Sequence, residues 1–148
     1  MNQRAMQFGK AFIAGFVSTL VFHQGVLALF YVAGASPRRP YDLDAVPPLH
    51  IPAVISLAFW GGVWGAAIWP LLKNATGAAY WLRALVIGAI GPSAVALFIV
   101  FPLKGLPMAG GWDPKLIVAA LILNGAWGLG VALLMRLLHR APRSAPEK

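Results

Sequence analysis

Four long apolar runs dominate the chain, and short polar or proline-rich stretches separate them. The first run carries no lysine, arginine, aspartate or glutamate and is long enough to cross a hydrocarbon layer about 30 Å thick. Three similar runs follow. The pattern therefore predicts an all-α membrane protein with four transmembrane helices, at residues 11–33, 52–72, 80–100 and 114–138.

Proline and aspartate mark the connections between the runs. Residues 34–51 are too rich in proline to continue a helix, and they predict a long outer loop. Pro52 suits the first turn of the second helix, where an amide hydrogen is not needed. Asp113 and Pro114 read as the N-cap and first position of the fourth helix. A basic tail, residues 139–148, follows that helix.

A cleaved signal peptide is the alternative interpretation of the first run. Arg4 and Lys10 form a basic start, and residues 33–35 match the small-residue cleavage pattern. The run is nevertheless longer than the apolar core of a signal peptide, about 7–15 residues. His23 and Gln24 in its middle are also unusual in a discarded segment. We therefore expect the first helix to be retained.

Two similar segments suggest an internal repeat. Residues 61–65 (GGVWG) resemble residues 124–128 (NGAWG) at an offset of 63, and Gly15 aligns with Gly88 at an offset of 73. Two tandem helical hairpins forming a pseudo-twofold four-helix bundle are expected, related by an axis along the membrane normal. Chance similarity between apolar helices is the alternative explanation. The repeat would place Trp64 and Trp127 at one depth, near the bilayer centre.

Small residues predict where the helices pack. Gly61 and Gly65 form a GxxxG pair, which allows two helix backbones to approach closely. Pro92, beside Gly91, cannot donate to the carbonyl of Gly88 and predicts a kink in the third helix. The residues expected to pack helix against helix are Gly15, Gly61, Gly65, Trp64, Gly88, Pro92, Trp127 and Gly128.

A few polar side chains fall near the middle of the spans. Ala11, Gly15, Thr19 and His23 recur every four residues and predict one small-residue face that ends in an imidazole. An ionisable residue inside a membrane is a functional candidate, although interhelical hydrogen bonds explain such residues equally well. The candidate midplane polar site consists of His23, Gln24, Ser93 and Asn124.

Composition and charge agree with a membrane protein and suggest its orientation. Hydrophobic residues make up 59% of the chain and charged residues 11%. The net charge of +8 comes from basic residues at the ends of the apolar runs. Eight lysines and arginines fall on the side of the termini and four on the other side, which places both termini inside. We therefore expect a multi-pass protein of the cytoplasmic (inner) membrane with its termini in the cytoplasm.

Little in the sequence points to chemistry. The chain has no cysteine, and the spans contain no carboxylate of the kind that couples ion-driven transport. Asp42, Asp44 and His50 are too loosely spaced for a convincing metal site, and Arg38 and Arg39 can pair with the aspartates. No metal, no cofactor and no enzymatic activity are expected. Haem or chlorophyll bound through His23 is the alternative.

Helix contacts in the membrane are therefore the basis of the leading functional hypothesis. We expect an accessory, assembly or scaffold component whose partners are the lipid bilayer and either further copies of the chain or a larger membrane complex. A small transporter or channel with a polar site around His23 is the first alternative, and a haem- or pigment-binding subunit the second. Nucleic acid is not expected, because the basic residues form no patch with interleaved aromatic residues.

Overall fold

The computed structural model describes residues 2–140 and is mostly helical. Four of its helical segments are long and apolar enough to cross a membrane, which confirms the predicted number. The first span consists of α1 (Gln3–Ser18), the π-helical segment η1 (Thr19–His23) and α2 (Gln24–Val32). The second is α3 (Ala53–Leu72). The third consists of α4 (Gly77–Val95), the π-helical segment η2 (Ala96–Val100) and α5 (Phe101–Leu103), and the fourth is α7 (Pro114–Arg140).

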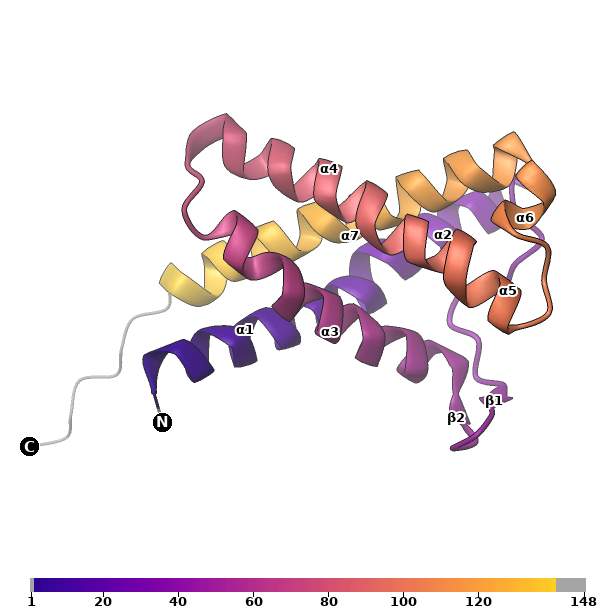
Figure 1. The fold of residues 1–148 in the computed structure, drawn as a ribbon, viewed down its shortest axis with the longest axis horizontal. Coiled ribbons are helices and arrows are strands. Elements are labelled where there is room, and N and C mark those ends of the chain that lie inside the picture. The colour runs from indigo at the N-terminus through magenta and orange to yellow at the C-terminus, as the bar shows by residue number, and fades with distance from the viewer. Residues whose placement is uncertain (1, 141–148) are drawn as a thin grey trace, which may run out of the picture.

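The four spans form two pairs, and each pair consists of consecutive spans. Helix α1 lies against α3, and α4 lies against α7 (Figure 1). A third contact joins α1 to α7 across the two pairs, whereas α3 and α4 touch over a shorter stretch. We call the end where α1 begins and α7 finishes the termini end, and the opposite end the loop end.

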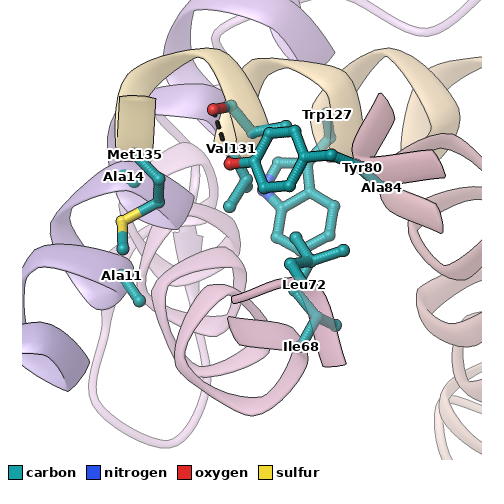
Figure 2. Packing of buried hydrophobic residues seen from close by; sticks show 10 residues of the cluster. Ala11, Ala14, Ile68, Leu72, Tyr80, Ala84, Trp127, Val131 and Met135 are labelled. Carbon is teal, nitrogen blue, oxygen red and sulfur yellow. Dashed lines mark hydrogen bonds between the residues drawn. The ribbon is translucent and has the colours of Figure 1, made fainter. Parts of the chain in front are cut away.

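The buried core lies in the half of the molecule near the termini end. Met135 lies beside Ala11 and Ala14, and Tyr80 lies above the ring of Trp127 (Figure 2). The Tyr80 hydroxyl donates to the carbonyl oxygen of Ala132 at 2.8 Å, which ties α4 to α7. Only 22% to 33% of the most apolar window of each span is buried within the protein. In a membrane, lipid would cover the remaining apolar surface.

Three spans extend beyond the ranges expected from the sequence, and the last of them, α7, ends at Arg140 instead of residue 138. The first begins at Gln3 instead of residue 11, because the Asn2 side chain caps it by accepting from the Arg4 amide at 3.1 Å. Its basic residue Lys10 is accommodated by donating to the Leu138 carbonyl at 3.0 Å. The third helical segment begins at Gly77 and ends at Leu103, one short helical piece past the predicted end.

Proline affects the helices differently from the expectation. Helix α4 continues through Pro92 to Val95, and the departure from α-helical geometry comes one turn later, in η2. Wider π-turns are one means by which a membrane helix accommodates the backbone groups that proline leaves unpaired. Pro52 is the N-cap of α3 and not part of its first turn.

The loops contain short ordered elements. In the loop before α3, β1 (Ala45–Val46) pairs antiparallel with β2 (Ile51–Pro52). Before α7, the segment α6 (Ala109–Trp112) contains Gly110 and Gly111 at positive φ, so it is closer to a tight turn than to a helix. Asp113 caps α7 by accepting from the Lys115 amide at 2.9 Å. Beyond residue 140, the predicted basic tail lies outside the described residues.

Candidate functional site

Helices α1 and α3 cross at three glycines. A Cβ atom on Gly15 would overlap the carbonyl oxygen of Gly61 and lie 3.0 Å from the Cα atom of Gly65. On the other side, a Cβ atom on Gly65 would overlap the carbonyl oxygen of Ala11. The two backbones therefore touch directly, as the GxxxG spacing of Gly61 and Gly65 allows.

The crossing of α4 and α7 repeats this geometry. A Cβ atom on Gly88 would lie 2.7 Å from the Cα atom of Gly128, and one on Gly128 would overlap the carbonyl oxygen of Ala84. Gly88 is the residue that aligns with Gly15, and Gly128 the one that aligns with Gly65. Aligned residues thus make the same backbone contact in the two helix pairs.

The two tryptophans of the similar segments lie between the helix pairs. Trp127 is 2% exposed, and its indole nitrogen donates to the Gly15 carbonyl at 3.0 Å. The Ser18 hydroxyl donates to the Trp127 carbonyl at 2.6 Å, so α1 and α7 are joined in both directions. Trp64 is half-buried and covers Gly91, where an added Cβ atom would lie 3.2 Å from its ring.

Ser93 and Asn124 lie together between α4 and α7. The Asn124 amide nitrogen donates to the Ser93 hydroxyl at 3.0 Å, and that hydroxyl donates to the Ala120 carbonyl at 3.1 Å. Ser93 is 1% exposed. These two hydrogen bonds therefore join α4 to α7 beside the glycine crossing.

His23 and Gln24 lie where η1 ends and α2 begins, and Gln24 is joined to the loop between α2 and α3. Gln24 is 3% exposed, and its side-chain oxygen accepts from the Tyr41 amide at 2.7 Å. Its amide nitrogen lies 3.5 Å from the Nδ1 atom of His23. The Tyr41 hydroxyl donates to the Leu20 carbonyl at 2.9 Å, so the loop folds back over the π-helical segment. Within residues 2–140, no hydrogen bond joins this group to Ser93 or Asn124.

The π-turn alters the small-residue stripe of the first span. Ala11, Gly15 and Thr19 are buried, but His23 is only half-buried. A π-helix bonds each carbonyl to the fifth residue along, so residues four apart no longer stack across η1. The sequence did not predict that Tyr41 anchors the loop. It showed only an aromatic residue near the expected membrane surface.

The aspartates of the loop between α2 and α3 form hydrogen bonds within that loop and with the start of α3. The Asp42 carboxylate accepts from the Asp44 amide at 2.9 Å, and the backbone of Asp42 accepts from Val54 at 2.9 Å. In the part of the chain that the structure describes, no three histidine, aspartate or glutamate side chains lie close enough to hold a metal ion.

Two cavities lie at the ends of the molecule. One, of about 250 Å³, opens at the termini end between α3, α4 and α7. The other, of about 610 Å³, opens at the loop end between α2 and α7, and its only charged lining residue is Lys115. No protein-family model, no curated protein and no solved structure matches the chain.

Proposed function

We propose that the protein is an accessory, assembly or scaffold component that acts through helix-helix contacts in the membrane. The observation that carries this proposal is the use of the polar side chains within the spans. Ser93, Asn124, Gln24 and Trp127 are all hydrogen-bonded to another helix or to the loop. Polar groups that all have partners make the unit rigid. A buried polar group that already has its partner is also poorly placed to bind a solute.

The alternative of a small transporter or channel has less support. Its proposed site needs His23, Gln24, Ser93 and Asn124 to converge, and they form two separate groups. None of the four residues is among the residues that line the two cavities.

The finer architecture belongs to the same proposal. Two tandem hairpins with a pseudo-twofold axis are supported by the matching glycine crossings at Gly15 and Gly88. A cytoplasmic-membrane location with both termini inside is supported by the excess of lysine and arginine at the termini end.

The outer face of α3 is the surface we propose for partner contact. Trp60 is 58% exposed and Phe59 49% exposed, and their rings pack edge to face at 5.8 Å. Trp60 lies well inside the span, although tryptophan prefers the membrane interface and needs a partner for its indole N–H. No hydrogen bond from this indole is present within residues 2–140. A neighbouring helix, from a second copy or a larger complex, would supply the missing acceptor.

A site-specific photocrosslinker tests the proposed contact in native membranes. The full chain carries the photoreactive residue at position 60, and the matched control carries it at position 21. Val21 is 55% exposed on the first span and lies near the same depth, because its neighbour Thr19 packs against Gly61. A discrete adduct from position 60, absent from position 21, is expected. Mass spectrometry of the adduct distinguishes a second copy from another membrane protein.

Two results would contradict the proposal. One is crosslinking to lipid alone from both positions. The other is a monodisperse monomer without co-purifying protein after extraction in mild detergent.

A further inference from the structure

The cavity at the termini end combines an arginine with aromatic rings. It lies where α3 ends, α4 begins and α7 finishes, and has a volume of about 250 Å³. Water occupies about 30 Å³ per molecule in the liquid, so the cavity has room for a small polar group of several heavy atoms. The side chains that matter below are Trp69, Thr76, Tyr80, Arg136 and His139.

In the part of the chain that the structure describes, Arg136 packs against aromatic rings and pairs with no carboxylate. Its guanidinium carbon lies 4.6 Å from the centre of the Tyr80 ring and 5.0 Å from that of Trp81. The acidic residues among residues 2–140 are Asp42, Asp44 and Asp113, all at the loop end. Within residues 2–140 the N–H groups of Arg136 therefore have no carboxylate partner, and their planar fork suits phosphate oxygens.

His139 and Thr76 offer further polar groups to the same space. The His139 ring stacks on Trp69 at 5.2 Å between centres, and its Nδ1 atom donates to the Met135 carbonyl at 2.6 Å. The Nε2 atom is left for another partner. Thr76 is the N-cap residue of α4, yet its hydroxyl makes no capping hydrogen bond. The first amides of α4 add the positive end of a helix dipole beside that hydroxyl.

We propose that this cavity binds a phosphate group and that an anionic phospholipid supplies it. The cavity lies at the ends of the spans, at the level where lipid headgroups sit, and Trp69, Tyr80 and Trp81 form the aromatic belt typical of that level. Anionic lipids are drawn to basic residues beside a membrane span. The guanidinium and the Thr76 hydroxyl would contact the phosphate oxygens, and the acyl chains would lie along the apolar surface of α4 and α7.

Native mass spectrometry of the full chain in mild detergent tests this binding. The protein is incubated with an equimolar mixture of phosphatidylglycerol and phosphatidylcholine, and the bound lipids are counted. One retained phosphatidylglycerol is expected. Arg136→Gln should weaken its retention at least tenfold, and Thr76→Val should weaken it severalfold without any change in net charge.

Arg83→Gln is the matched control. Arg83 is an exposed cation at the same end that does not line the cavity. Non-specific attraction to an anionic surface, about fivefold in affinity per cation, would affect both arginine variants equally. Equal losses in the two variants, or no preference for phosphatidylglycerol, would overturn the proposal. Arg136→Lys, which keeps the charge but not the planar fork, should fall between the wild type and Arg136→Gln.

Inorganic phosphate separates the two possible sources of the anion. The melting temperature of the protein is measured in phosphatidylcholine nanodiscs with and without phosphate, and again in nanodiscs that contain phosphatidylglycerol. Stabilisation by phosphatidylglycerol alone supports the lipid. Stabilisation by inorganic phosphate alone would overturn the lipid as the source.

Discussion

Glycine positions decide how closely the helices of this protein approach each other. At Gly15 and Gly65 the space that a side chain would occupy is filled by the backbone of the opposite helix. In a membrane, lipid tails are as apolar as leucine side chains, so close backbone packing supplies much of the attraction between helices. The stability of the fold therefore depends on the absence of a side chain at these two residues.

Gly15→Ala is expected to destabilise the protein by about 1 to 3 kcal/mol, the usual cost of overpacking a tight contact. Gly9→Ala is the control, because nothing lies within 4 Å of a Cβ atom at Gly9 in the same helix. Alanine favours helix over glycine by up to about 1 kcal/mol, so the control should be neutral or slightly stabilising. Thermal unfolding in detergent measures both variants. Equal melting temperatures for the two would show that the crossing is looser than described.

Side-chain size along the sequence revealed part of this packing. Ala11, Gly15 and Thr19 formed a visible stripe, and all three are buried. The partners of the polar residues were less predictable, because they depend on three-dimensional neighbours. Asn124 finds Ser93 on another helix, and Gln24 finds the backbone of Tyr41 in a loop.

At the scale of elements, the first and third spans each contain a π-helical segment, in the middle part of the first span and near the loop end of the third. A π-turn inserts one residue into the helical repeat and turns the following residues to a new face. In the first span, Gln24 and the Leu20 carbonyl face the loop between α2 and α3, where Tyr41 binds both. The loop is thus anchored to the helix at the π-turn.

Tyr41→Phe should loosen this loop without unfolding the helices. A hydrogen bond contributes about 1 kcal/mol net, so its loss would raise the open population of the loop about fivefold. Hydrogen exchange across residues 34–51 measures the change. Tyr31→Phe is the control, since Tyr31 is 41% exposed and its hydroxyl makes no hydrogen bond within residues 2–140. Identical exchange in the two variants would refute the anchoring role of the Tyr41 hydroxyl.

Apolar length and proline spacing were enough to predict the four long helices, but they did not predict how the helices end. Hydropathy changes at Lys10, whereas the helix continues outward to Gln3 because Asn2 caps it. The apolar pattern also did not predict the π-turns. Every residue of η2 is apolar, so the pattern is the same whether this segment is α-helical or π-helical.

At the scale of the whole molecule, the start of α1, the end of α7 and the connection between α3 and α4 share one end (Figure 1). Among residues 2–140, six of the ten lysines and arginines lie at this end, and the three acidic residues lie at the other. This charge asymmetry predicts that the termini end faces the cytoplasm.

Single cysteines test that orientation, and the chain has none of its own. Arg4→Cys and Lys73→Cys should resist a membrane-impermeant maleimide in intact cells and react after the cells are opened. Arg39→Cys and Lys104→Cys should react in intact cells. All four positions are exposed, so local burial does not explain protection. The reverse pattern would place the termini outside, and mixed labelling at one end would contradict four spans.

The hydrogen bond from Trp127 to Gly15 also has a consequence for synthesis. It joins residues 112 positions apart, whereas the glycine crossings join helices that are consecutive spans. A chain made from its N-terminus can form the contact of α1 with α3 early, but α1 must then wait for the last span. During that interval the Gly15 carbonyl and the Ser18 hydroxyl would face lipid or an insertion factor, and the arrival of Trp127 would close the molecule.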